Sequence, residues 1–270
     1  MSTTRIGVFD SGVGGLTVLR ELIRHVPNSE YLYFGDTARL PYGSKSVETI
    51  ARYAVGASRF LQDRGVELLV VACNTATALA LDCIVQSLEI PVIGVVEPGA
   101  EHAANASKSR SVIVIGTEAT VLSHAYQRAL ASRGVTTREK ACPLLVPLVE
   151  EGWTEHYVTE QVARIYLGEV FAEEIRSRSH SDVLVLGCTH YPLLKPLLKR
   201  IVPNDVAIVD SAESTAQVVA QKLGLAPEPH ADATADVYCF VTDSVEKFRR
   251  LGPRFLGHPL NGVEHINLGG

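Results

Sequence analysis

The chain has 270 residues, of which 46% are hydrophobic and 20% charged, a balance typical of a globular protein with a substantial core. This length allows one large domain or two of ordinary size. The net charge of −5 argues against nucleic acid or acidic lipid as a partner, although such a surface can still carry a basic pocket for a small anion.

The N-terminal residues 1–4 are polar and lack the basic stretch and apolar core of a signal peptide. No apolar run approaches the roughly 18 residues of a membrane span. The cysteines are odd in number, scattered and without a CxxC pair, which favours reduced thiols in a cytoplasm over a disulfide framework. They are Cys73, Cys83, Cys142, Cys188 and Cys239. We therefore predict a cytoplasmic protein.

Short β-rich runs alternate along the chain with helical periodicity. The predicted strands are 6–9, 31–34, 68–71, 92–96, 112–115, 183–186, 206–209 and 237–241. Apolar stripes predict helices over 16–26, 50–61 and 121–130, and Gly65 and Gly134 mark the ends of the second and third. Strands that alternate with helices predict an α/β fold with mostly parallel sheets and right-handed crossovers.

A weak internal repeat accompanies this order. Residues 5–12 resemble 111–117, and VVACNT at 70–75 resembles VLGCTH at 185–190. Two similar α/β halves would explain the repeat, although any two βα units resemble each other to some extent.

Ligands of open α/β sheets bind beyond the carboxyl ends of the strands, so the residues just after the apolar runs carry the most information. The first run ends in DSGVGG, which begins at Asp10 and leads into a helix. Its glycines allow close approach of backbone N–H groups to a ligand, and the helix N-terminus suits a carboxylate. Asp10 could equally serve only as a helix cap.

Two cysteines occupy matching positions after strands. Cys73 lies in ACNT and Cys188 in GCTHYP, and each precedes side chains that can hydrogen-bond a carboxylate or an amine. A single cysteine in such a place is more often a small buried apolar residue. Two in matching halves indicate function, and a helix N-terminus at each would favour thiolate. The other three cysteines are interpreted as structural.

Two further segments stand out. Residues 35–43, GDTARLPYG, are too polar for core, with a plain loop as the alternative. Glu150 and Glu151 follow an apolar stretch, and for either one alone a solvated helix end is the simpler interpretation.

Together DSGVGG, GDTARLPYG, ACNTAT, IGTEAT, LVEEG and LGCTHYPLL, in this order, resemble the glutamate racemases of the aspartate/glutamate racemase superfamily. The resemblance extends from Arg5 to Phe255. It implies two pseudo-symmetric α/β domains with the active site between them and a last segment that returns to the first domain. We therefore predict a first domain of 1–96 plus 208–270 and a second domain of 97–207.

The resemblance also implies an activity, the racemisation of glutamate by a cysteine pair, which supplies D-glutamate for peptidoglycan. Cys73 and Cys188 would be the bases, Asp10 and His190 would assist their respective cysteines, and Glu150 would be the partner of His190. The residues expected to hold the substrate's carboxylates and amine are Asp10, Ser11, Tyr42, Gly43, Asn74, Thr75, Thr117, Thr189 and His190. At Leu40 the chain departs from the family, where many members carry cysteine, serine or another small residue.

No cofactor and no metal are expected. None of the suspected site segments places a lysine at a strand end, which argues weakly against pyridoxal phosphate, and the resemblance argues strongly against it. The N-terminal extension with which some family members bind a cell-wall precursor is not expected in this chain. The expected partners are the small-molecule substrate and, as a candidate, a second copy in a homodimer; neither nucleic acid nor a membrane is expected.

Three alternatives remain from the residues themselves. The chain could act on aspartate, a hydantoin or another α-carboxylate. The paired thiols could instead bind a metal or sense oxidants, although His190 is the only obvious further ligand. A purely structural α/β protein would make the matching cysteine turns a coincidence.

Overall fold

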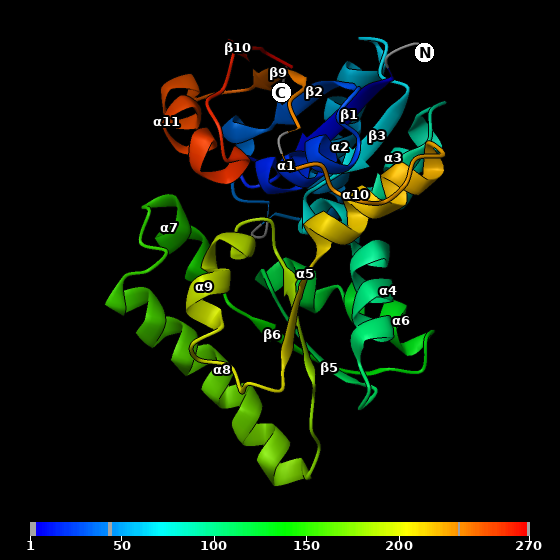
Figure 1. Ribbon diagram of the computed structural model, residues 1–270. Helices are drawn as coiled ribbons and strands as arrows, with labels where there is room; N and C mark the ends of the chain where they lie inside the picture. Colours follow the sequence, from blue (N-terminus) through cyan, green and yellow to red (C-terminus); the bar gives the residue numbers. More distant parts are fainter. Residues whose placement is uncertain (1–3, 43–44, 232, 269–270) are drawn as a thin grey trace. The chain divides into compact units, whose positions relative to one another are not determined.

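The computed structural model describes residues 4–42, 45–231 and 233–268, and the chain forms two compact units (Figure 1). Unit 1 comprises Met1–Val95 and Ala212–Gly270, and unit 2 comprises Val96–Ser211. The domain limits predicted from the sequence, 1–96 plus 208–270 and 97–207, remain a proposal about which segments fold as independent domains.

Unit 1 is built on a parallel sheet whose described strands follow the order β10-β9-β2-β1-β3-β4. The strands are β1 (Arg5–Asp10), β2 (Glu30–Gly35), β3 (Leu68–Val71), β4 (Val92–Gly94), β9 (Asp236–Val241) and β10 (Val263–His265). The helices are α1 (Leu16–His25), η1 (Thr37–Arg39), α2 (Val47–Gln62), α3 (Asn74–Ser87), α10 (Ser211–Lys222) and α11 (Val245–Leu256).

Alternation along β2 distributes its side chains between the two faces of this sheet, because successive residues of a strand point to opposite sides. Leu32 and Phe34 join the core beneath α2 and α3. On the other face, Tyr31 donates hydrogen bonds to the carbonyls that end α1, and Tyr33 packs against Phe248 of α11. Burial on both faces explains why these strands read as continuous apolar runs.

Unit 2 contains a smaller parallel sheet, in the order β6-β5-β7-β8 among its described residues. Its strands are β5 (Ser111–Gly116), β6 (Thr136–Ala141), β7 (Val183–Gly187) and β8 (Ala207–Asp210). Its helices are α4 (Val96–Ala106), α5 (Glu118–Leu122), α6 (Ala125–Ala131), α7 (Leu145–Glu150), α8 (Tyr157–Ser177), η3 (Tyr191–Leu194) and α9 (Lys195–Leu198). The apolar faces of α4 and α6 pack on β5 and β7, and Figure 1 shows α8 and α9 on the other side of the sheet.

Each sheet has one topological switch point. The chain leaves β1 toward β2 and leaves β3 toward β4, so the connections after the adjacent strands β1 and β3 run in opposite directions. The connections after β5 and β7 diverge in the same way. Such points open a crevice at the carboxyl ends of the strands. The order β2-β1-β3-β4 in unit 1 thus corresponds to β6-β5-β7-β8 in unit 2, which matches the internal repeat.

The predicted α/β class with parallel sheets is confirmed, and two strands were missed. β6 has the polar sequence TTREKA and lies at a sheet edge, where only part of each side chain is buried, so it carries no apolar run. β10 has three residues and lies at the edge of the other sheet. The single helix predicted over 121–130 is wrong: His124 adopts a left-handed conformation, φ 53°, that separates α5 from α6.

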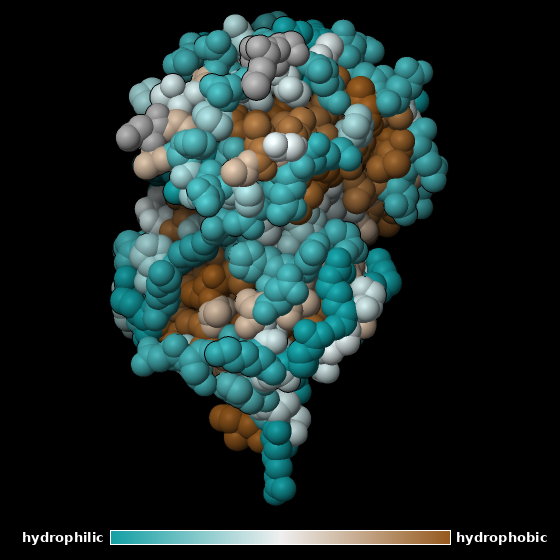
Figure 2. Space-filling model, turned by 45° about the vertical axis from the view of Figure 1, so that its right-hand side comes forward, coloured by the Kyte–Doolittle hydropathy of each residue, from teal (hydrophilic) through white to brown (hydrophobic). Residues whose placement is uncertain are grey.

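On the face shown in Figure 2, hydrophilic residues predominate and apolar areas interrupt them. Exposed apolar side chains in unit 2 include Leu144, Tyr157 and Ile165. Among the described residues, no helix combines the length and the apolar character that a membrane span requires.

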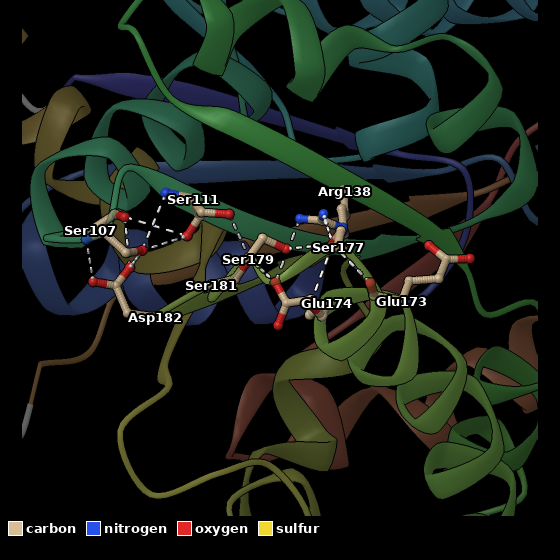
Figure 3. A network of polar contacts seen from close by, with 10 residues as sticks. Ser107, Ser111, Arg138, Glu173, Glu174, Ser177, Ser179, Ser181 and Asp182 are labelled. Atoms are coloured by element: carbon tan, nitrogen blue, oxygen red, sulfur yellow. Dashed lines mark hydrogen bonds and ion pairs between the residues drawn. The ribbon is translucent and has the colours of Figure 1, made fainter.

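A polar network joins elements of unit 2 at the end of its sheet where β5 and β7 begin (Figure 3). Asp182, just before β7, accepts hydrogen bonds from Ser107 Oγ at 2.6 Å, from Lys108 N at 2.7 Å and from Ser109 N at 2.8 Å. Desolvation raises the pKa of Asp182, but these hydrogen bonds outweigh it and hold the pKa well below its ordinary value. The carboxylate thereby fixes the turn between α4 and β5.

Replacing Asp182 with alanine should lower the free energy of unfolding by about 1–2 kcal/mol at pH 7, because a charged acceptor of several hydrogen bonds is lost. Since the folded pKa is depressed, this stability is present above the unfolded pKa and is lost as the pH falls through the folded pKa. Urea denaturation of both proteins should therefore give a difference that shrinks below about pH 4. Asp205→Ala, which removes an exposed partner of His180, is the control and should change stability by less than about 1 kcal/mol. An equal loss at pH 7 and pH 3 would contradict the role of the charge.

Candidate active site

The switch point of unit 1 brings together the ends of β1 and β3. Phe9 pairs with Val71, and Ala72 N donates to Phe9 O at 2.8 Å, so the residues that follow the two strands lie side by side. The Cys73 thiol donates to Ser11 Oγ at 3.5 Å across this junction. Two segments 62 residues apart in the sequence thus form one small site.

Asp10 is buried, and its Oδ2 accepts a hydrogen bond from Gly12 N at 2.9 Å. It is not the residue that caps the following helix, because α1 begins after Gly15. A Cβ atom at Gly15 would lie 2.5 Å from Asp10 Cβ, so this glycine leaves the space that the aspartate occupies. Asp10 therefore packs against the start of α1 without capping it.

Cys73 is the N-cap residue of α3, and its sulfur accepts a hydrogen bond from Ala76 N at 3.4 Å. Burial and the negative charge of Asp10 raise the pKa of the Cys73 thiol to about 12, against the hydrogen bonds with Ser11 and Ala76 that lower it. The expectation that a helix N-terminus favours thiolate here is wrong in its outcome, because desolvation outweighs the helix. Cys73 is held as a neutral thiol.

The switch point of unit 2 brings together the ends of β5 and β7, where Gly116 pairs with Gly187. Cys188 follows β7 and is buried. Unlike Cys73 it does not begin an α-helix, since the next element is the 3-10 helix η3. Its sulfur instead lies 4.0 Å from His190 Nδ1, and His190 Nε2 lies 3.2 Å from Glu150 Oε1 at the end of α7.

Glu150 accepts a hydrogen bond from His190 Nε2, and the Cys188 sulfur at Nδ1 can either donate to a neutral ring as a thiol or accept from an imidazolium. Burial lowers the pKa of His190, but the hydrogen bonds with Cys188 and Glu150 and the charges of both partners outweigh it and raise the pKa to about 10. At neutral pH a positive imidazolium therefore lies beside the Cys188 sulfur, where it attracts negative charge.

Most of the other residues expected at the site follow the same strand ends. Asn74 and Thr75 form the buried first turn of α3, and Thr189 is buried next to Cys188. Thr117 caps α5 by accepting from Thr120 N at 3.3 Å. The Tyr42 hydroxyl donates to Asp36 Oδ2 at 2.6 Å, a partner that the sequence did not indicate. Gly43 lies outside the described residues.

Of the cysteines interpreted as structural, two are buried and one is not. Burial raises the pKa of Cys142 and of Cys239, each to about 12. Cys83 is exposed on α3, because the buried face of this helix carries Ala80 and Ile84 instead. In the part of the chain that the structure describes, no three histidine, cysteine or acidic side chains gather as a metal site would require.

Comparison with known proteins gives consistent results. Residues 6–219 match the family described as Asp/Glu/Hydantoin racemase. A glutamate racemase from Koribacter versatilis is 62% identical, with 98% of each chain covered. A crystal structure of a glutamate racemase isoform from Bacillus anthracis is 37% identical with a TM-score of 0.87, and it too covers 98% of each chain. A glutamate racemase from Francisella tularensis, solved in complex with D-glutamate, is 33% identical with a TM-score of 0.86 over 99% of each chain.

Replacing Gly15 with alanine should destabilise the protein by about 1–3 kcal/mol, because the added methyl group has no room beside Asp10. The matched control is Gly56→Ala in α2 of the same unit, where an added Cβ meets nothing within 4 Å. This control should stabilise the protein by about 1 kcal/mol through helix propensity. Urea denaturation measures both, and equal stability changes in the two variants would refute the packing argument.

Proposed function

The chain belongs to the Asp/Glu/Hydantoin racemase family, and from this premise we propose that it interconverts L- and D-glutamate without a cofactor, using Cys73 and Cys188 as the two bases. The observation that carries the proposal is the placement of one cysteine at the switch point of each sheet, each with its own polar partner. High identity to glutamate racemases over nearly the whole chain supports the choice of substrate.

Racemisation removes a proton from the α-carbon and returns one to the opposite face. The neighbouring carboxylate makes this carbon a very weak acid, so the developing negative charge needs stabilisation by hydrogen-bond donors. A single base does not easily serve both faces, whereas a thiolate on one face and a thiol on the other form a general base and a general acid. The two cysteines exchange these roles when the direction reverses.

The different surroundings of the cysteines suit complementary roles. With L-glutamate as the substrate, Cys73, a buried thiol beside Asp10, is the acid. Cys188, beside the His190 imidazolium, is then the base. We assign deprotonation of L-glutamate to Cys188 and of D-glutamate to Cys73, which the family resemblance also implies. Glu150 stabilises the positive charge of His190 and orients its ring through the contact at Nε2.

Substrate binding is assigned to the hydrogen-bonding groups that follow the four central strand ends. These are Asp10, Ser11, Asn74, Thr75, Thr117, Thr189 and His190, together with Tyr42 and Gly43 of the loop after β2. Among them, Asn74 and Thr75 lie in the first turn of α3, and the N-terminus of a helix favours a carboxylate.

In the cell we propose that the product, D-glutamate, enters peptidoglycan synthesis in the cytoplasm. Free thiols at all five cysteines are compatible with that reducing compartment. We also propose that the protein assembles as a homodimer. Light scattering of the purified protein would measure its molar mass and so test this.

The decisive experiment starts from pure L- or D-glutamate in heavy water, with no added cofactor or metal, and follows products by chiral chromatography and mass spectrometry. Two bases predict early product with deuterium at the α-carbon while unreacted substrate keeps protium, because the proton removed is not the proton returned. Cys73→Ala and Cys188→Ala should each lower racemisation by about 10²–10⁴-fold. Cys83→Ala, at an exposed thiol, is the control and should retain activity.

Unlabelled early product would contradict the two-base mechanism even in an active racemase. Activity that requires pyridoxal phosphate would contradict cofactor independence. Faster turnover of aspartate than of glutamate in the same assay would move the substrate assignment to another member of the family.

The pH dependence of kcat/KM should reflect the protonation of His190. L- and D-glutamate have equal free energies, so kcat/KM must be the same in both directions at every pH. It should fall for both enantiomers as pH rises through about 10, because the imidazolium beside Cys188 is lost there. His190→Asn should lower kcat/KM by about 10–10²-fold at neutral pH, the loss of one charged hydrogen bond, and abolish this fall. His258→Asn, at an exposed histidine, should leave the profile unchanged. A fall near pH 10 that persists in His190→Asn would assign it to another group.

A further inference from the structure

The loop after β2 is organised around a buried carboxylate that the proposed reaction does not use. Asp36 is fully buried, and three side chains meet it: Oδ2 accepts from the Tyr42 hydroxyl at 2.6 Å, and Oδ1 accepts from Arg39 Nη1 at 3.0 Å and from Thr242 Oγ1 at 2.9 Å. Two of these partners belong to the loop itself. The third, Thr242, comes from the connection between β9 and α11.

Thr242 binds the loop by more than one atom. Its hydroxyl donates to Asp36 and accepts from Ala38 N at 2.9 Å, and its backbone N donates to Gly35 O at 3.3 Å. The next residue, Asp243, donates its N–H to Thr37 Oγ1 at 2.9 Å, and its carbonyl accepts from the same hydroxyl. The parallel pairing of Gly35 with Val241 makes these contacts possible, because it aligns the ends of β2 and β9.

Tyr42 connects the hydrogen bonds around Asp36 with the candidate active site. Its ring is 2% exposed, packs 6.4 Å from the Phe9 ring and belongs to the same core cluster as Cys73. Burial and the adjacent Asp36 raise the pKa of Tyr42 far above its ordinary value, so it remains a neutral donor to that carboxylate. The side chain therefore anchors the loop, and the loop backbone is left as the part that can meet a substrate.

We propose that Thr242 is a positioning residue for substrate binding: it fixes Asp36, Asp36 fixes Tyr42, and together they hold the loop 37–42 beside Cys73. This proposal rests on the proposed function. This role differs from a purely structural one, because the threonine hydroxyl determines the conformation of the loop and not the stability of the fold. The effect should fall on binding of glutamate, since no atom of Thr242 takes part in proton transfer.

Thr242→Val keeps the shape of the side chain and removes both hydrogen bonds of its hydroxyl. It should raise KM for glutamate about tenfold and change kcat by less than about threefold, the pattern of lost uniform binding. Thr242→Ser restores the hydroxyl and should return KM to within about twofold of wild type. Thr159→Val is the control, because Thr159 is a buried threonine whose hydroxyl donates to the Trp153 carbonyl at 2.6 Å in the other unit. It should lower thermal stability without raising KM.

A double-mutant cycle tests the path through Tyr42. If Thr242 acts through Asp36 and Tyr42, Tyr42→Phe should also raise KM, and the double variant should be little worse than the more affected single variant. A folded Thr242→Val enzyme with unchanged KM, or effects of the two substitutions that add in full, would overturn the proposal and leave the racemase assignment intact. A wild-type protein that does not racemise glutamate would overturn the assignment and this proposal with it.

Discussion

The parallel pairing of β1 with β3 and of β5 with β7 is the constraint on which the candidate site depends. In a parallel pair the carboxyl ends lie at the same edge, and opposite crossovers leave that edge uncovered. Asp10 and Cys73 follow one pair of strands, and Thr117 and Cys188 follow the other. A shift of register by one residue would turn these side chains toward the opposite face of the sheet, so the buried apolar strands fix the chemistry as well as the fold.

Equivalent positions in the two sheets do not give equivalent cysteines. Around Cys73 the dominant effect is desolvation, reinforced by the negative charge of Asp10. Around Cys188 the dominant neighbour is His190, whose pKa is raised by its hydrogen bonds with Cys188 and with Glu150. A reaction that needs one acid and one base can use this inequality in one direction, and the two cysteines must exchange these roles in the other direction.

The loop after β2 extends the same logic to the C-terminal part of the chain. β9 lies next to β2, and the residues beyond it bind the loop that carries Tyr42. The segment that returns to unit 1 therefore does more than enlarge the sheet, because it also holds the loop after β2 in place. The additional strands β9 and β10, which have no counterpart among the described strands of unit 2, place Thr242 where it can hold Asp36.

The sequence by itself determined the α/β class, most strands and the residues at the strand ends, because apolar runs and the small polar turns after them are local patterns. It also indicated the cysteine pair, since the two turns resemble each other. It missed β6, whose polar residues suit a sheet edge, and the break at His124, where one left-handed residue divides an apolar stripe. The protonation of Cys73 and the role of Thr242 were decided only by the tertiary structure. Desolvation and strand neighbours depend on which distant segments pack together, and no local pattern records that.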